Sequence, residues 1–329
     1  MKFLVTGASG FIGSHISDDL LNRGYEVRCI IRKTSNLRWL KGKNIELVEA
    51  SLDNKESLMN AVGGVDSIIH SAGLTAAKNY DEFLRGNRDG TKNLISVASE
   101  YSPNIQRFLY VSSQTVVGPS KSIEHPMDES SPCNPITSYG KSKREAELEV
   151  LKLKDKLPIT IIRPPAVYGP RDTASFDIFK TIYKGLAPLI GMKPKYASII
   201  HSGDLSRGII DAAISEKSIG EIYFITSEQF YTWDQINATI IKAFNDKKTL
   251  KLKIPHSIVL SIGAISGALG KFSKKPPVFN YEKGIDFIQN FWTCSVEKAK
   301  KDLNFSQKIS LEDGMRDTAI WYIENGWLK

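Results

Sequence analysis

Three side chains near the middle of the chain could carry out proton transfer: Ser113, Tyr139 and Lys143. Tyr139 and Lys143 are four residues apart in a segment with a helical pattern, so they share one helix face. A phenol has an ordinary pKa near ~10, and a neighbouring ammonium group favours its ionised form. Ser113 follows the apolar run 107–112, which is typical of a buried strand. We therefore expect Tyr139 to be the proton donor and acceptor, with Lys143 supplying the charge and Ser113 holding the substrate oxygen.

The start of the chain predicts a phosphate-binding loop. The apolar run 3–5 reads as a buried strand, Gly7, Gly10 and Gly13 follow at once, and a helical pattern then continues to about Arg23. The first glycine permits a tight turn, the second lets the backbone approach a pyrophosphate, and the third lets helix and strand pack closely. The N-terminus of the helix offers free N–H groups to the anion. This context predicts a dinucleotide site rather than an ordinary glycine turn, and it also argues against Tyr139 and Lys143 being merely a solvated helix pair.

The residue after the second strand, 26–31, indicates which dinucleotide is bound. An acidic side chain at this place binds the ribose hydroxyls of NAD, whereas this chain has Arg32 followed by Lys33. A guanidinium group attracts the extra phosphate of NADP. We therefore predict NADP as the cofactor. The alternative is that Arg32 is a surface cation and that the protein binds NAD through other contacts.

Strand and helix patterns alternate through the first half of the chain, which predicts an α/β fold of the Rossmann type with a doubly wound parallel sheet. We expect a dinucleotide-binding domain over 1–171, to which 200–225 returns, and a smaller substrate-binding lobe built from 172–199 and 226–329. Ser138 is expected to cap the helix that carries Tyr139. The expected elements are strands 3–5, 26–31, 45–50, 67–70, 107–112, 159–162, 197–200 and 221–225, and helices 80–101 and 204–215.

Composition restricts the class of protein. With 41% hydrophobic and 24% charged residues, the chain has the make-up of a soluble globular protein. The three cysteines, Cys29, Cys133 and Cys294, lack disulfide or metal-ligand spacing, which favours a reducing cytoplasm. No apolar run is long enough to span a membrane. The net charge of +8 is read as a solvated lysine face rather than a nucleic-acid site, because no recognition motif accompanies it. The basic excess is visible at Lys271, Lys274, Lys275, Lys283, Lys298, Lys300 and Lys301.

The segment 258–269 is apolar on nearly every side and contains Gly263 and Gly267. We expect a buried helix, or one that lines an apolar pocket, because no polar face is evident. The alternative is a helix that lies on a membrane surface, with Lys271, Lys274 and Lys275 at the interface.

These motifs together resemble the extended short-chain dehydrogenase/reductase superfamily, which includes the NAD(P)-dependent epimerases and dehydratases. Within it, the chain looks most similar to the branch of dihydroflavonol-reductase-like and 3β-hydroxysteroid-dehydrogenase-like proteins. The resemblance covers the whole chain and is carried by residues 7–13 (GASGFIG), 70–73 (HSAG), 87–91 (NRDGT), 111–113 (VSS), 139–143 (YGKSK), 163–170 (RPPAVYGP) and 317–328.

The resemblance implies which residues bind the cofactor, and that Lys143 also holds the nicotinamide ribose. Pro164, Pro165 and Val167 would pack against the nicotinamide ring, and Asn87 would be either a relay or a structural hydrogen bonder. Ser51 stands where the family often has an acidic residue near the adenine. The implied cofactor-binding residues are Gly7, Ser9, Gly10, Phe11, Ile12, Gly13, Arg32, Ser51, Leu52, Ser71, Ala72, Gly73, Asn87, Val111, Tyr139, Lys143, Pro164, Pro165 and Val167.

The resemblance implies hydride transfer between the nicotinamide and a hydroxyl or carbonyl carbon of a small, mainly apolar substrate. Ala166 stands where nucleotide-sugar epimerases carry an asparagine that contacts the substrate diphosphate, which weakens that alternative. A second alternative is a catalytically idle dinucleotide-binding regulator. No metal is expected, since His70 and His201 read as structural residues without further ligands nearby.

The resemblance also implies a homodimer. In the family, helices that correspond to 87–101 and 141–153 pair across a two-fold axis. We expect an outward apolar stripe on each of them, formed by Leu94, Val97 and Ala98 on the first and by Ala146, Leu148 and Leu151 on the second.

Overall fold

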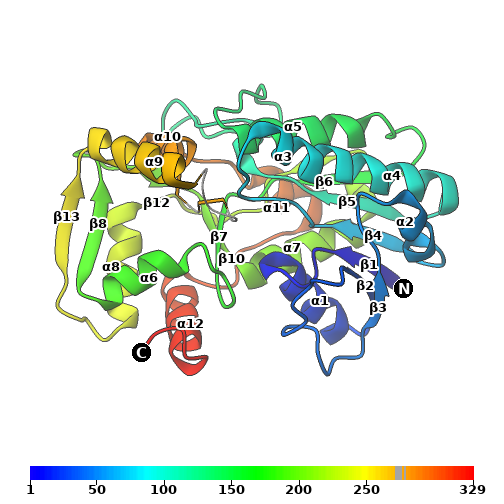
Figure 1. Ribbon diagram of the computed structural model, residues 1–329, viewed down its shortest axis with the longest axis horizontal. Coiled ribbons are helices and arrows are strands. Elements are labelled where there is room, and N and C mark those ends of the chain that lie inside the picture. Colours follow the sequence, from blue (N-terminus) through cyan, green and yellow to red (C-terminus); the bar gives the residue numbers. More distant parts are fainter. Residues whose placement is uncertain (271–275, 278) are drawn as a thin grey trace.

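A seven-stranded sheet in the order β11-β6-β5-β4-β1-β2-β3 dominates the computed structural model, which describes residues 1–270, 276–277 and 279–329 (Figure 1). All neighbouring strands in it are parallel. The strand order reverses at β1, so the carboxyl ends of β1 and β4 border the crevice where such sheets bind ligands. The doubly wound parallel sheet predicted from the sequence is confirmed. Its strands are β1 (Lys2–Thr6), β2 (Glu26–Ile31), β3 (Glu46–Glu49), β4 (Ser67–His70), β5 (Arg107–Val111), β6 (Ile159–Ile162) and β11 (Ile222–Tyr223).

Helices cover both faces of this sheet, and each face has its own apolar core. Neighbouring residues of β1 show the alternation: Phe3 and Val5 belong to one core, and Leu4 belongs to the other. The first core is closed by α1 (Phe11–Asn22), α7 (Ser202–Ile214) and α11 (Glu297–Leu303). The second is closed by α2 (Lys55–Val62), α4 (Gly90–Tyr101) and α5 (Ser138–Leu151).

Two helices differ from the expectation, one in its continuity and the other in the residue that caps its N-terminus. The expected helix 80–101 is divided into α3 (Tyr80–Phe83), a π-helical turn η1 (Leu84–Asp89) and α4. At the start of α5, the N-cap is Thr137, whose hydroxyl accepts from Gly140 N. The prediction that Ser138 is the cap is wrong, because the Ser138 hydroxyl donates instead to Glu282 Oε1 at 2.6 Å. Short 3₁₀ turns are η2 (Gln114–Val116) and η3 (Glu216–Ser218).

The remaining elements form smaller sheets around an aromatic core, in which Tyr322 packs against Phe176, Phe179 and Trp327. The expected strand 197–200 is two strands that join different sheets, with Ser198 between them accepting from Cys294 N. The strands are β7 (Ala166–Tyr168), β8 (Leu186–Ile190), β9 (Tyr196–Ala197), β10 (Ile199–His201), β12 (Tyr231–Thr232), β13 (Leu250–Ile254) and β14 (Phe291–Trp292). The helices are α6 (Phe176–Tyr183), α8 (Trp233–Ala243), α9 (His256–Gly270), α10 (Tyr281–Ile288) and α12 (Leu311–Glu324).

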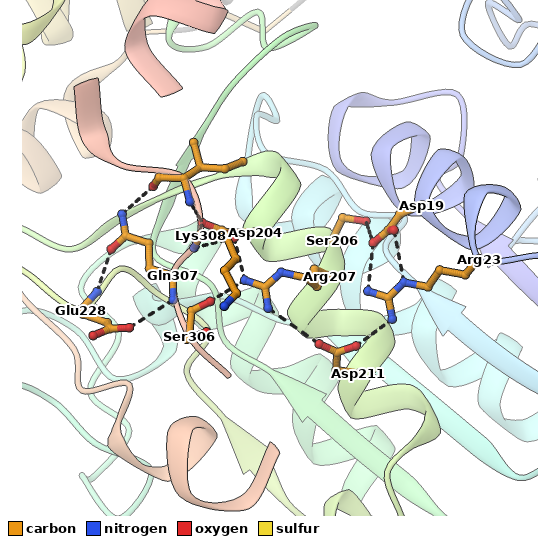
Figure 2. A network of polar contacts seen from close by, with 11 residues as sticks. Asp19, Arg23, Asp204, Ser206, Arg207, Asp211, Glu228, Ser306, Gln307 and Lys308 are labelled. Atoms are coloured by element: carbon orange, nitrogen blue, oxygen red, sulfur yellow. Dashed lines mark hydrogen bonds and ion pairs between the residues drawn. The ribbon is translucent and has the colours of Figure 1, made fainter. Parts of the chain in front are cut away.

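A polar network ties the C-terminal part of the chain to the large sheet (Figure 2). Asp204 of α7 is buried and accepts from the backbone N–H groups of Lys308 and Ile309, at 3.0 and 2.9 Å from Oδ2. Arg207 Nη2 donates to the same carboxylate at 2.7 Å. Further along α7, Asp211 accepts at 2.7 Å from Arg23, the residue that directly follows α1. The network therefore fixes the segment before α12 against two helices of the sheet.

The structure corrects two expectations about apolar faces. Helix α9 is not buried all round, since one side of it is open to solvent and only Val259, Gly263 and Gly270 are buried. The outward stripe expected on α4 and α5 is also wrong, because the side chains of most of its members are buried in the core between these helices and the sheet, and only Leu148 is exposed. The buried members are Leu94, Val97, Ala98 and Ala146. Lys271, Lys274 and Lys275 lie outside the described residues.

Candidate functional site

The glycine loop has the close approaches that its sequence predicts. Gly7 has a φ of +73°, and a Cβ there would stand 2.8 Å from Ala72 N, so only glycine fits this turn. A Cβ on Gly13 would collide with the carbonyl of Gly7, which explains the tight packing of α1 on β1. Gly10 is exposed and is the N-cap of α1, and it has no side chain that could form a capping hydrogen bond with the first N–H groups of the helix. The first N–H groups of α1, next to Ser9, Phe11 and Ile12, are therefore suited to a diphosphate.

The end of β4 is fastened to β1 across the same edge of the sheet. Ser71 Oγ donates to the Thr6 carbonyl at 2.7 Å, and Ala72 N donates to Thr6 Oγ1 at 3.1 Å. The small residues Ser71, Ala72 and Gly73 thus form a fixed shelf beside the glycine loop. A larger side chain at Gly73 would meet Asn87 Oδ1, only 3.0 Å from the position of its Cβ.

His70 is a structural residue, as the sequence suggested. Thr91 Oγ1 donates its proton to the Asn87 carbonyl at 2.6 Å, so it accepts from His70 Nε2 at 2.9 Å. The other ring nitrogen, Nδ1, then accepts from Thr6 Oγ1 at 2.7 Å. Burial, together with the charge of Lys143, lowers the pKa of His70 to about 3, so the imidazole stays neutral.

Asn87 lies in the π-helical turn η1 and is buried. Its Oδ1 accepts from Leu74 N at 2.7 Å, and its Nδ2 donates to the Leu74 carbonyl at 3.1 Å and to Ser142 Oγ at 2.8 Å. Both amide protons are used inside the protein. These contacts are those of a structural hydrogen bonder, one of the two roles that were expected, and they join the shelf after β4 to helix α5.

The Lys143 ammonium group is buried at the carboxyl end of β5, two residues before Ser113. Its Nζ donates to the Val111 carbonyl at 2.8 Å and stands 4.3 Å from the centre of the Tyr110 ring. Burial lowers the pKa of Lys143 to about 7, and the charge of Glu147 acts in the opposite direction. A Cβ on Gly73 would stand 3.8 Å from this ammonium group, which places Lys143 beside the shelf.

The Tyr139 phenol faces Ser113. The pKa of Tyr139 is raised to about 12, mainly by burial. A hydrogen bond with Ser113 lowers this pKa in part, and the negative charge of Asp286 raises it further. This differs from the expectation that Lys143 favours the phenolate, because desolvation dominates in the structure. Ser113 Oγ accepts from Thr115 N at 3.2 Å and from Thr115 Oγ1 at 2.9 Å. Its own proton is therefore available for an oxygen next to Tyr139.

A buried ion pair fixes α5 on the sheet. Arg163, at the end of β6, donates from Nε to Glu147 Oε1 at 2.8 Å and from Nη2 to Oε2 at 2.7 Å. Arg163 is 2% exposed, and the Glu147 side chain is 0% exposed. Since Glu147 is one turn beyond Lys143 on α5, the pair sets the position of the helix that carries both Tyr139 and Lys143.

The segment after β6 returns to the same edge of the sheet. Pro164 and Pro165 are buried, and the Pro164 carbonyl accepts from Gln114 N at 2.8 Å, directly after Ser113. Val167 of β7 is half-buried against the core. These three residues therefore follow the strand neighbouring Ser113, where the sequence placed them.

The positions expected to face the adenosine lie at the ends of β2 and β3. Arg32 is exposed, its backbone N donates to Ser35 Oγ at 2.9 Å, and within the described part of the chain it forms no ion pair. Ser51 N donates to Ser57 Oγ at 3.1 Å, and the Leu52 carbonyl accepts from Asn93 at 2.8 Å. The Leu52 carbonyl is thus already used within the protein.

Three residues next to the site were not found from the sequence. Thr6 and Thr115 orient the shelf and Ser113, and their positions one or two residues from motif residues could have indicated this. Asp286 of α10 is buried, acts on the phenol of Tyr139, and has one oxygen, Oδ1, without a hydrogen-bond partner among the described residues. Nothing in the local sequence indicates that Asp286 lies near a tyrosine far away in the chain.

The chemistry of these residues fits a nicotinamide dinucleotide. The free end of α1 suits its diphosphate, and the shelf, Lys143 and the segment after β6 border one edge of the sheet. Within residues 1–270, 276–277 and 279–329, no group of three potential metal ligands is found. No helix in that part of the chain is both long and apolar enough to cross a bilayer.

Comparison with known proteins gives a family match. The profile of the NAD dependent epimerase/dehydratase family matches residues 3–226. A ceramide reductase from Caulobacter vibrioides is 27% identical and covers 98% of this chain and 95% of its own length. A decarboxylating sterol-4-alpha-carboxylate 3-dehydrogenase from Dictyostelium discoideum is 26% identical, covering 94% of this chain and 98% of its own.

The fold is also shared with solved structures. The UDP-glucuronic acid 4-epimerase from Bacillus cereus, in complex with NAD, superimposes with a TM-score of 0.78 at 22% identity and covers 99% of both chains. At this identity the likeness concerns the fold alone.

Proposed function

Since the chain belongs to the NAD-dependent epimerase/dehydratase family and is an oxidoreductase of the extended short-chain type, we propose that Tyr139, Ser113 and Lys143 carry its reaction. The reaction is hydride transfer between the cofactor and a hydroxyl or carbonyl carbon of a small, mainly apolar substrate. The observation that carries this proposal is the meeting of the three side chains at the carboxyl edge of the sheet, beside the glycine loop.

The residues favour the reduction of a carbonyl group. A phenol with a pKa of about 12 is fully protonated at neutral pH, so Tyr139 can donate its proton to a substrate oxygen. The Ser113 hydroxyl, with both acceptor positions already used by Thr115, donates a second hydrogen bond to the same oxygen. A bound nicotinamide dinucleotide supplies the hydride for the substrate carbon. Lys143, when protonated, stabilises the phenolate left on Tyr139, and water restores its proton.

The test of this proposal is Tyr139→Phe. The variant should lose at least ~100-fold in kcat, because the proton donor is gone. Dinucleotide affinity, measured by fluorescence titration, should stay within about threefold. The matched control is Tyr101→Phe, at the exposed end of α4, which should keep both quantities. A Tyr139→Phe variant that turns over near the wild-type rate would show that another group is the acid.

For the substrate, two named relatives guide the choice. Ceramide and sterol 4α-carboxylates are the compounds in the names of the ceramide reductase and the Dictyostelium dehydrogenase, and both are largely apolar. Ala166 supports this class, because it offers no hydrogen bond to a substrate diphosphate. A substrate panel should therefore contain long-chain and polycyclic ketones and alcohols, with UDP-sugars as the comparison set.

We propose NADP rather than NAD as the cofactor, on the strength of Arg32. Its side chain is exposed at the end of β2 and forms no ion pair in the described part of the chain, so its guanidinium is free for a phosphate. Arg32→Asp should weaken NADPH binding by ~10- to 100-fold and leave NADH binding within about threefold, since one charge-assisted contact is lost. Lys154→Asp, at an exposed position after α5, controls for the change in net charge. Equal losses for both cofactors would refute the role of Arg32.

A second candidate function is a nucleotide-sugar epimerase or dehydratase, favoured by the matching family profile, which is that of NAD dependent epimerases and dehydratases. Such a cycle reduces and reoxidises a tightly held NAD. Denaturing the purified protein and identifying any released dinucleotide separates the two: near-stoichiometric NAD supports the epimerase, and an empty protein that prefers NADPH supports the reductase. A protein that binds a dinucleotide but turns over no member of the panel would instead be the non-catalytic regulator.

Three further expectations stay predictions. The two-lobe division, with 200–225 belonging to the dinucleotide-binding part, is to be checked by limited proteolysis. A homodimer is to be checked by sedimentation at micromolar concentration; its contact would have to use exposed residues of α4 and α5 such as Leu148. The cytoplasmic location is to be checked by cell fractionation.

A further inference from the structure

Exposed apolar side chains gather at the end of the molecule opposite to the large sheet. Among the described residues, the five most exposed large apolar side chains all belong to this end, with Met192 at 70% and Leu269 at 67%. Figure 1 shows α9, β8 and β13 together there. We call this set the apolar end surface; its members are Leu186, Met192, Leu250, Leu252, Ile258, Ile262, Ile265 and Leu269.

The α9 part of the apolar end surface is a continuous stripe. Ile258, Ile262, Ile265 and Leu269 are spaced by four, three and four residues, so they lie along one side of the helix. The opposite side packs on α10, where Gly263 lets the helix approach Asn280 and Leu260 contacts Gly284. Helix α9 contains no Asp, Glu, Lys or Arg, so no charge solvates the exposed stripe.

The strand part continues the surface. In the parallel pair β8–β13, Leu186 is opposite Leu250, and Ala187 is opposite Lys251. Residues directly opposite each other point to the same side of a sheet, and Ala187 is buried. The leucines at 186, 250 and 252 therefore form the outer side of the pair. Gly191 lies against His256, which brings the loop with Met192 to the start of α9.

Lysines outnumber carboxylates in the segment that contributes α9 and β13 to this surface. Residues 247–281 contain seven lysines and no Asp or Glu, although the whole chain has a net charge of only +8. Of the described lysines, Lys248 and Lys253 are exposed, Lys251 pairs with Asp234 at 2.7 Å, and Lys247 stands 4.1 Å from the Tyr183 ring. An apolar strip with lysines beside it is complementary to an anionic lipid surface. The lipid headgroups can pair with the lysines, and the leucine and isoleucine side chains can be buried at the acyl boundary.

From this arrangement we propose that the protein docks on anionic lipid bilayers through the apolar end surface. A second copy of the chain fits this surface less well, because a two-fold contact would bring the exposed Lys248 and Lys253 of both copies together, and Asp234 is already paired with Lys251. Docking is peripheral, since no helix in the described part of the chain could span the bilayer.

Helix α10 links the apolar end surface to the candidate active site. Helix α10, which packs under α9, carries Glu282, and Glu282 accepts from Ser138 N at 3.0 Å and from its hydroxyl at 2.6 Å. Ser138 directly precedes Tyr139 on α5. Docking would therefore bring the α9–α10 pair, and with it the edge of the active site, close to the membrane, where apolar substrates dissolve. This consequence rests on the proposed function, whereas the docking itself does not.

Vesicle flotation tests the docking. Full-length protein is mixed with vesicles of equal parts phosphatidylcholine and phosphatidylglycerol, and with vesicles of phosphatidylcholine alone, without substrate. We expect flotation with the anionic vesicles, at least ~10-fold weaker flotation with the neutral ones, and a loss of binding in high salt. Ile262→Glu/Ile265→Glu should lower the partition coefficient by at least ~10-fold, because it removes apolar contact and adds negative charge.

The control is Ile214→Glu/Ile219→Glu. Ile219 is 50% exposed, compared with 51% for Ile262, and both control residues lie near the sheet edge at β11. The control makes the same charge change and should float like wild type. Dinucleotide affinity verifies folding of both variants and is independent of docking, so loss of docking does not speak against the proposed reaction.

Three results would overturn the proposal. The first is wild-type protein that stays unbound with both kinds of vesicle, and the second is equal flotation of the two double variants. The third is a wild-type protein that does not float with either kind of vesicle but sediments as a dimer, and whose dimer is dissociated by Ile262→Glu/Ile265→Glu. This result would assign the apolar end surface to contact with a second copy of the chain.

Discussion

The buried ion pair between Arg163 and Glu147 of α5 gives the sharpest test of how the candidate site is held. Glu147→Gln should lower the free energy of unfolding by about 3–5 kcal/mol. Glu147 accepts two charge-assisted hydrogen bonds from Arg163, at 2.8 and 2.7 Å, each contributing ~1.5–3 kcal/mol. The amide keeps at most one of them and leaves the guanidinium, which is 2% exposed, without a counter-charge. Arg144, 3.3 Å from the carboxylate, is 29% exposed and can recover water, so it adds little.

The assay is urea unfolding at neutral pH, followed by tryptophan fluorescence and by circular dichroism. The control is Glu149→Gln on the same helix, since Glu149 pairs with Lys152, whose side chain is 64% exposed. The control should cost less than ~1 kcal/mol. If Glu147→Gln also costs less than ~1 kcal/mol, the pair does not anchor α5, and the positions of Tyr139 and Lys143 must be maintained by apolar packing and by the other hydrogen bonds of the helix.

Two further predictions concern stability. Asp204→Asn should lower the free energy of unfolding by about 2–4 kcal/mol in the same assay, because the buried Asp204 carboxylate accepts from the backbone N–H groups of Lys308 and Ile309. The control is Asp313→Asn, in an exposed ion pair, which should cost less than ~1 kcal/mol. Equal costs for the two variants would contradict this reasoning. Burial raises the pKa of Asp286 to about 6, so the folded chain binds this proton more tightly than the unfolded chain does, and stability falls as the pH rises from about 4 to about 6. Asp286→Asn should remove that part of the slope, on the order of 3 kcal/mol, when unfolding is measured across this range, and an unchanged slope would exclude Asp286 as its source.

Most of the large sheet could be predicted because its signals are local. The bounds of β2, β4 and β6 agree with those expected from the sequence, since a strand buried on both faces is rich in neighbouring apolar residues. The expected helix 80–101 was right in place but wrong in continuity. Asn87, in the π-helical turn, forms hydrogen bonds with Leu74 and Ser142, and a pattern along one helix does not contain such contacts.

The candidate site was predictable where its members are set by spacing. Tyr139 and Lys143 share a helix face because they are four residues apart, and the glycines form a turn because the backbone there requires a left-handed residue and a close helix contact. The pKa of Tyr139 was not predictable. Its shift comes from burial and from Asp286, both of which depend on segments folded over α5.

The sequence by itself therefore determined the order of the strands in the first half of the chain and the glycine turn after β1, and it supplied the hypothesis that Tyr139 is the acid–base group. Only the tertiary structure decided which side chain caps α5, since Ser138 was free to be the cap until α10 brought Glu282 to its hydroxyl. It also decided that one side of α9 stays exposed. The physical reason is that periodicity records which residues share a face, whereas burial, hydrogen-bond choice and pKa depend on what the rest of the chain places against that face.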